Sequence, residues 1–169
     1  MLVVGLDNSG KTTIIASIKP TRSQPGEVVP TVGFEVDQFA KAGLQFTVFD
    51  MSGARKYRTL WESYYKDAEA VIFVIDSADE LRMPMVKDEL DELLAHADLP
   101  RGIPVLFFAN KKDLPTSLPP GQCAASLMLD KIQDRPWQIV HCAAISGDGV
   151  EEGFAWLADT VKKRRERGK

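Results

Sequence analysis

The chain has 169 residues, of which 44% are apolar and 27% are charged, and its net charge at pH 7 is −3. This length supports one domain with a real core and is too short for two, so we expect a single domain over residues 1–169. A negative balance gives no general attraction to nucleic acid, and no apolar stretch approaches the length of a membrane span, so neither role is expected.

The apolar pattern alternates between strand and helix periods, which predicts an α/β domain with a mostly parallel sheet. Residues 1–4 predict a first strand that is shorter than usual, so we expect a truncated start. Alternating runs at 34–39 and 44–49 predict a hairpin, and continuous apolar runs at 71–75 and 105–109 predict central strands. The other expected elements are helices at 11–18, 85–95, 122–132 and 151–165, a loop at 21–30 and a strand at 138–142.

The two cysteines and the N-terminus indicate a compartment. Cys123 and Cys142 show neither metal-binding nor disulfide spacing, so they are interpreted as small core residues in a reducing compartment such as the cytosol. The first residues also lack the basic region of a signal peptide.

The first motif lies between the first strand and the first helix and fits the P-loop pattern G-x-x-x-x-G-K-[ST]. Gly5 and Gly10 allow a tight turn that points backbone N–H groups at a phosphate, Lys11 can reach the outer phosphates, and the Thr12 hydroxyl can bind Mg²⁺. An ordinary Gly-rich turn is the alternative. The predicted phosphate-binding residues are Asp7, Asn8, Ser9, Gly10, Lys11, Thr12 and Thr13.

A second motif, Asn110-Lys111-Lys112-Asp113, follows the predicted central strand at 105–109 and indicates guanine. Guanine presents two adjacent donors, N1–H and the N2 amine, which one carboxylate such as Asp113 can accept together. Adenine offers an acceptor at the same place and would be rejected. Asn110 can steady the loop or the N7 side of the base, and the stem of Lys111 can lie over the ring.

A third group of residues predicts how Mg²⁺ and the outermost phosphate are bound. The D-x-x-G segment that starts at Asp50 follows the hairpin; its carboxylate can hold Mg²⁺ through water, and the Gly53 N–H can sense a γ-phosphate. Thr31, on the loop before the hairpin, can supply a second hydroxyl to Mg²⁺ beside that of Thr12. Each signal is weak alone, but their order along the chain supports one site.

Together these motifs resemble the small GTPases of the Ras superfamily and, within it, the ADP-ribosylation factor (Arf) branch. Residues 5–13, 30–34, 57–65 and 146–149 carry the resemblance, which covers essentially the whole chain. It implies a Ras-like P-loop fold, with a six-stranded, mostly parallel sheet, one antiparallel edge strand and helices on both faces. It also implies that GTP or GDP is bound together with Mg²⁺.

Within this branch, residues 48–53, 79–83 and 106–111 resemble the Arf-like GTPases linked to Bardet–Biedl syndrome. That similarity implies a monomeric cytoplasmic switch that binds membranes peripherally at the cilium or basal body and recruits the BBSome coat when GTP is bound. It also implies an exchange factor and an activating protein. Members of this branch start with an amphipathic membrane helix, which we expect the truncated start to lack. The resemblance implies that sliding the hairpin at 34–49 by two residues couples that helix to the nucleotide, since such a slip keeps each side chain on its original face.

The resemblance further implies an effector patch and a loop that contacts the base. Ala144 would offer its N–H to guanine O6 with Ile145 beside it, although Ala143 replaces the usual serine. The apolar patch that effectors touch would comprise Phe34, Phe49, Trp61 and Tyr64. Alternatively, these aromatic residues are ordinary core residues.

Position 54 departs from the family, whose members usually place after D-x-x-G a glutamine that orients the attacking water. This chain has Ala54, which has no group to hold water. The remaining catalytic candidates are Lys11, Thr31 and Gly53. We therefore expect intrinsic hydrolysis slowed on the order of a hundredfold, with efficient turnover only when an activating protein supplies the missing groups.

Other functions remain open at the level of sequence. A constitutively GTP-bound scaffold would suit Ala54, and an Arf-like GTPase could serve other membrane-trafficking cargo. A P-loop kinase would need an Arg-rich lid, and nothing between Asp76 and Pro104 offers one.

Overall fold

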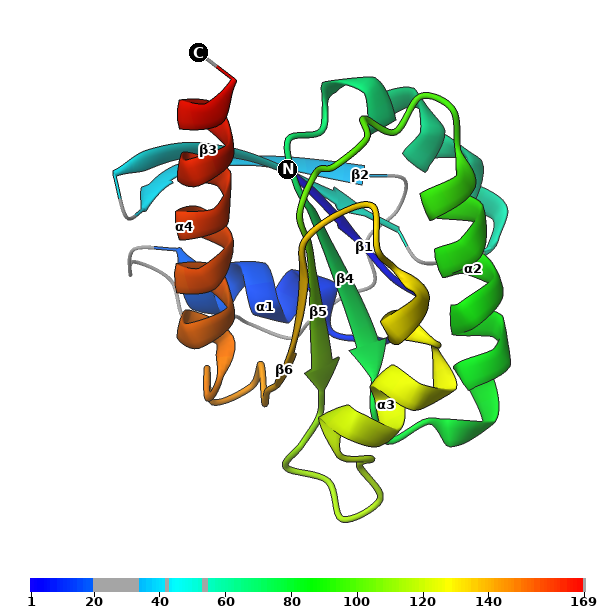
Figure 1. Cartoon of the computed structure of the whole chain (residues 1–169). Helices are drawn as coiled ribbons and strands as arrows, with labels where there is room; N and C mark the ends of the chain where they lie inside the picture. Colours follow the sequence, from blue (N-terminus) through cyan, green and yellow to red (C-terminus); the bar gives the residue numbers. More distant parts are fainter. Residues whose placement is uncertain (20–33, 42, 53–54, 169) are drawn as a thin grey trace.

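The computed structural model describes residues 1–19, 34–41, 43–52 and 55–168 (Figure 1). One six-stranded sheet crosses the molecule, with α1 and α4 on one face and α2 and α3 on the other. The strands are β1 (Leu2–Val4), β2 (Phe34–Lys41), β3 (Leu44–Met51), β4 (Val71–Asp76), β5 (Val105–Asn110) and β6 (Trp137–His141). The helices are α1 (Lys11–Ile18), α2 (Met83–Ala95), α3 (Pro120–Ser126) and α4 (Val150–Arg167), and the 3₁₀ segments are η1 (Arg55–Asp67), η2 (Glu80–Arg82) and η3 (Leu129–Lys131).

The strand order is β2-β3-β1-β4-β5-β6, and only the edge strand β2 is antiparallel to its neighbour. This confirms the predicted six-stranded, mostly parallel sheet with one antiparallel edge strand and helices on both faces. The continuous apolar runs became β4 and β5 because both of their faces are covered, and every residue of β5 is buried.

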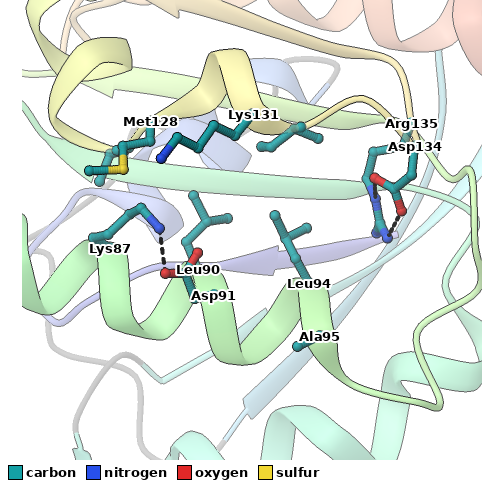
Figure 2. A pocket seen from close by; sticks show the side chains of 11 residues that line it. Lys87, Leu90, Asp91, Leu94, Ala95, Met128, Lys131, Asp134 and Arg135 are labelled. Carbon is teal, nitrogen blue, oxygen red and sulfur yellow. Dashed lines mark hydrogen bonds and ion pairs between the residues drawn. The ribbon is translucent and has the colours of Figure 1, made fainter.

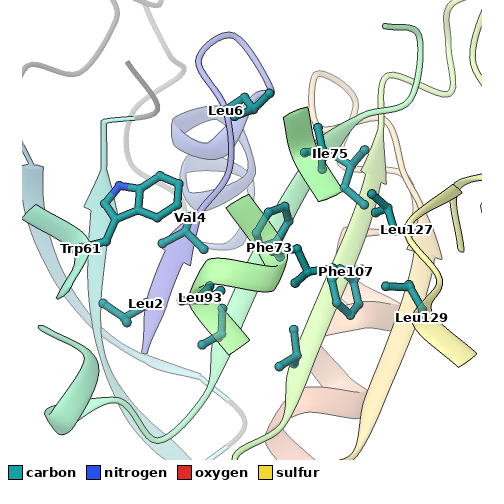
Figure 3. Packing of buried hydrophobic residues seen from close by; sticks show 14 of the residues in the cluster. Leu2, Val4, Leu6, Trp61, Phe73, Ile75, Leu93, Phe107, Leu127 and Leu129 are labelled. Atoms are coloured by element: carbon teal, nitrogen blue, oxygen red, sulfur yellow. The ribbon is translucent and has the colours of Figure 1, made fainter. Parts of the chain in front are cut away.

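The two faces of the sheet form two separate apolar cores. On one face, η1, α2 and α3 cover β1, β4 and β5, and the packing includes Trp61, Phe73, Leu93 and Phe107 (Figure 3). On the other face, α1 and α4 bury Phe108 and the hairpin residue Phe46. Cys123 lies in the first core and Cys142 in the second, as predicted, and both are free thiols.

Most element boundaries differ by a residue or two from the sequence prediction, and one predicted helix is divided in two. The hairpin strands extend to Lys41 and Met51, and the edge position of β2 leaves Val36 47% exposed. Helix α2 starts at Met83, because Pro84 in its first turn needs no N–H partner there. The single helix predicted at 122–132 is two elements, since Met128 has a left-handed backbone (φ 52°) that ends helical geometry.

A cavity of about 410 Å³ lies between α2 and the segment that follows α3 (Figure 2). Its floor contains Leu90 and Leu94, and the ion pairs Lys87–Asp91 and Asp134–Arg135 lie along it. None of the residues predicted to bind nucleotide lines this cavity. It is therefore separate from the site described below.

The packing of α4 on β5 requires a glycine. A Cβ atom at Gly153 would lie 2.6 Å from the buried Phe108 ring, whereas a Cβ at Gly121 in α3 would meet nothing within 4 Å. We predict that Gly153→Ala lowers the free energy of unfolding by about 1–3 kcal/mol. Gly121→Ala is the matched control and should raise it by up to about 1 kcal/mol, because alanine favours a helix. Urea unfolding monitored by circular dichroism measures both; equal effects would contradict the packing argument.

Candidate functional site

The described residues of the predicted nucleotide-binding motifs come together at one edge of the sheet, where the parallel strands end (Figure 1). The P-loop follows β1, the segment 110–113 follows β5, and the segment 143–145 follows β6. Segments separated by a hundred residues thus share the carboxyl edge of the sheet, where open α/β sheets bind ligands.

The backbone of the P-loop explains its glycines. Gly5 and Gly10 have positive φ angles of 147° and 96°, and Asn8 has a left-handed φ of 60°. A Cβ on Gly5 would lie 2.3 Å from the Val74 carbonyl oxygen, and one on Gly10 would lie 2.2 Å from Asn110 Nδ2. Both positions therefore require glycine for close approach as well as for backbone angle. Helix α1 begins directly after Gly10 with no side-chain cap, which leaves N–H donors for an anion.

The side chain of Lys11 is held inside the P-loop by hydrogen bonds to the loop backbone. Its side chain is buried, and Nζ donates to the carbonyl oxygens of Gly5 (3.1 Å) and Leu6 (2.9 Å). Burial lowers the pKa of Lys11 to about 8, an effect that the negative charges of Asp50 and Asp7 partly oppose. A bound phosphate would supply the counter-charge that this ammonium needs.

The predicted metal ligands Thr12 and Asp50 lie in contact. The Thr12 hydroxyl donates to Asp50 Oδ2 at 2.5 Å, and Asp50 Oδ1 is buried without a hydrogen-bond partner among the described residues. Burial raises the pKa of the Asp50 carboxyl, against the Thr12 hydrogen bond and the charge of Lys11. An orphaned buried carboxylate oxygen beside a hydroxyl fits Mg²⁺, which takes one or two protein oxygens and completes its shell with phosphate and water. Among the described residues, no group of three or more histidine, cysteine, aspartate or glutamate side chains could hold a metal ion.

Asn110 connects three loops. Its Nδ2 donates to the Ser9 carbonyl oxygen in the P-loop (2.9 Å), and its Oδ1 accepts the Ala144 N–H (2.9 Å) and the Cys142 thiol (3.5 Å). The sequence left two roles open for Asn110, to steady the loop or to contact the N7 side of the base. These hydrogen bonds match the first role. The Ala144 N–H, predicted to meet guanine O6, is directed at Asn110 here.

The rest of the guanine motif is held by acidic residues that the sequence reasoning did not single out. Lys111 has a left-handed backbone (φ 70°) and an ion pair with Asp76 at 2.6 Å, while Lys112 pairs with Asp148 at 2.5 Å. Asp113 is exposed, with no ion pair within the described part of the chain. Asp76 ends the apolar run of β4, and this abrupt change to a carboxylate is the sequence feature that could have identified it as a site residue.

The predicted effector residues separate into two environments. Phe49 and Tyr64 are partly buried, and their rings lie 4.7 Å apart between β3 and η1. Trp61 is only 2% exposed and donates Nε1–H to the Ser52 carbonyl oxygen at 3.2 Å, so the structure places it in the core rather than on a surface. The side chain of Phe34 and residues Thr31, Gly53 and Ala54 lie outside the described residues. Thr13 is partly exposed and Ile145 is 82% exposed.

Among the described helices, none combines the length and the apolar character needed to cross a bilayer.

Comparison with known proteins finds the same family along nearly the whole chain. Residues 1–161 match the ADP-ribosylation factor family. ADP-ribosylation factor-like protein 6 of Danio rerio is 52% identical over 96% of this chain and 88% of its own length, and the Caenorhabditis elegans protein of that name is 41% identical over 98% and 88%. The solved structure of the Arl6 BBS3 small GTPase of Trypanosoma brucei with bound nucleotide analogue GppNp has 44% identity and a TM-score of 0.89, covering 96% of this chain and 98% of that chain.

The buried ammonium of Lys11 predicts proton uptake on ligand binding. With a pKa of about 8 in the empty site, Lys11 is largely deprotonated above pH 8.5, and nearby phosphates raise its pKa so that it takes up a proton. Calorimetric titration with GDP in buffers of different ionisation enthalpy should show fractional proton uptake at pH 8.5 and little at pH 6.5. Uptake that does not change with pH would show that Lys11 is already fully charged in the empty protein.

Proposed function

The chain belongs to the ADP-ribosylation factor family of small GTPases, and we propose that it is a GTP-dependent switch that recruits the BBSome coat to membranes for ciliary trafficking. The observation that carries the switch is the assembly of the P-loop, the Thr12–Asp50 pair and the Asn110 motif at one edge of the sheet. The similarity to Arl6 BBS3 supports the choice of coat. The cytoplasmic location, with peripheral membrane binding at the cilium or basal body, follows from the same similarity.

Nucleotide binding divides into tasks for separate groups. The P-loop N–H groups and Lys11 bind the phosphates, and Asp113 accepts the two guanine donors, which adenine lacks. Thr12 and Asp50 would hold Mg²⁺, Asp50 through water as predicted, and the ion when bound neutralises phosphate charge. We assign Thr31 and Gly53 to the outermost phosphate from their motifs alone.

The link from nucleotide to effector would run through β3. This strand carries Asp50 at the metal site and, one residue earlier, Phe49 against Tyr64 of η1. Ser52 lies two residues after Asp50, and its carbonyl oxygen accepts a hydrogen bond from the Trp61 indole N–H. A contact between Gly53 and a γ-phosphate would therefore reposition η1 and the aromatic pair, which is how phosphate-sensing loops act as switches.

The effector surface can be tested with the chain loaded with GDP or with a non-hydrolysable GTP analogue. We predict at least about tenfold tighter binding of purified BBSome in the GTP-like state. Phe49→Ala and Tyr64→Ala should each weaken binding by about tenfold, because they remove the paired rings. Leu114→Ala is the matched control, since Leu114 is 41% exposed but follows β5 rather than β3.

Equal affinity in both nucleotide states would exclude a switch and favour a constitutive scaffold. State-dependent binding to another trafficking coat, with none to the BBSome, would keep the switch and change its cargo.

Hydrolysis is the second test, because Ala54 replaces the water-positioning glutamine. Ala54→Gln should raise the single-turnover rate of GTP hydrolysis on the order of a hundredfold, without a change in GTP affinity. An activating protein should accelerate the unsubstituted chain by supplying the missing group. A variant that hydrolyses GTP no faster than the unsubstituted chain would show that position 54 does not limit the reaction.

A further inference from the structure

Arg82 joins the P-loop to the segment that follows β4. Its guanidinium donates from Nη1 to Asp7 Oδ1 and from Nη2 to the Asp7 carbonyl oxygen, both at 3.1 Å. Its Nε donates to Asp79 Oδ2 at 2.6 Å, which fixes the direction of the planar fork. The two contacts with Asp7 connect segments 75 residues apart in the sequence.

The contact with the carbonyl oxygen fixes a particular peptide. In a trans peptide the C=O and the following N–H point in opposite directions. When Arg82 holds the Asp7 carbonyl, the Asn8 N–H is aimed away from Arg82. Asn8 has a left-handed φ of 60°, a backbone that asparagine adopts more readily than most other residues with a side chain.

Arg82 and Lys11 hold the loop from two sides. Lys11 donates hydrogen bonds to the carbonyl oxygens of Gly5 and Leu6. Arg82 donates to the next carbonyl oxygen along the chain, that of Asp7. Three consecutive carbonyl groups are thus bound by two cations that come from different elements. Removing Arg82 would leave the Asp7–Asn8 peptide free to rotate, while Lys11 would still hold the Gly5 and Leu6 carbonyl groups in place.

The two halves of the contact differ in strength. The Asp7 side chain is 57% exposed, so its ion pair with Arg82 is weakened by water and salt. A hydrogen bond from a charged donor to a backbone carbonyl is stronger than one between neutral groups and does not need a second full charge. Both contacts with Asp7 are exposed, and the carbonyl contact is the one that acts directly on the Asp7–Asn8 peptide.

We propose that Arg82 is a positioning residue that slows the release of bound nucleotide by orienting the Asp7–Asn8 peptide of the P-loop. This inference rests on the proposed binding of guanine nucleotide and adds one group that controls its lifetime. An exchange factor that drew Arg82 away from Asp7 would free that peptide and speed release.

The test measures dissociation of a fluorescent GDP from the full chain in the presence of Mg²⁺. Arg82→Gln should speed release by about tenfold, since the carbonyl loses its charged donor. Arg82→Lys should give an intermediate rate, because a single ammonium cannot serve Asp79 and both Asp7 oxygens in the same geometry. Arg167→Gln removes the same charge from an exposed position on α4 and should leave the rate unchanged.

Asp7→Asn separates the two contacts, since it removes the carboxylate charge and keeps the carbonyl. It should speed release only about two- to threefold, and the double variant with Arg82→Gln should be no faster than Arg82→Gln alone. Equal acceleration by Asp7→Asn and Arg82→Gln would assign the effect to the ion pair and overturn the role of the peptide.

Two further outcomes are distinguishable. If Arg82→Gln releases GDP at the unsubstituted rate while its thermal unfolding midpoint falls, Arg82 is only structural and the inference fails. If the unsubstituted chain retains no fluorescent GDP, the proposed function fails first.

Discussion

The site depends on one buried carboxamide. Asn110, 3% exposed, connects the P-loop at Ser9 to the loop at Ala144, and those residues lie 101 and 34 positions away from it in the sequence. Gly10 has no side chain, which leaves the room that the Asn110 Nδ2 group occupies. This bridge joins the loop predicted to bind phosphate directly to the loops predicted to bind the base. A fully satisfied buried polar group can hold loops in one arrangement because every alternative costs a desolvated donor or acceptor.

The charges around that bridge oppose stability in the empty protein. Lys11 is buried with a lowered pKa, and Asp50 is buried with a raised pKa and one oxygen without a partner among the described residues. A phosphate and a divalent cation would supply the missing charges, so binding them stabilises the folded state by mass action. The two unbalanced buried charges, Lys11 and Asp50, therefore lie where β1 and β3 end.

Support for the P-loop comes from outside the motifs. Arg82 binds Asp7 from the segment after β4, and Asp76 binds Lys111 from the end of β4 itself. On the effector side, the Trp61 indole is anchored at Ser52 inside the core, while Phe49 and Tyr64 form the partly buried pair. The structure thereby divides these aromatic residues into one that lies in the core and two that stay partly exposed.

The sequence by itself determined the sheet, its central strands and the motifs, because continuous apolar runs and fixed spacings such as Gly5 to Thr12 depend on local chemistry. It also predicted helix α1 with the observed bounds. Only the tertiary structure decided the break at Met128, the burial of Trp61, the exposure of Val36 and the partners of Arg82 and Asn110. Those features arise from contacts between residues distant in the chain, and neither periodicity nor motif spacing records which side chains meet across the sheet edge.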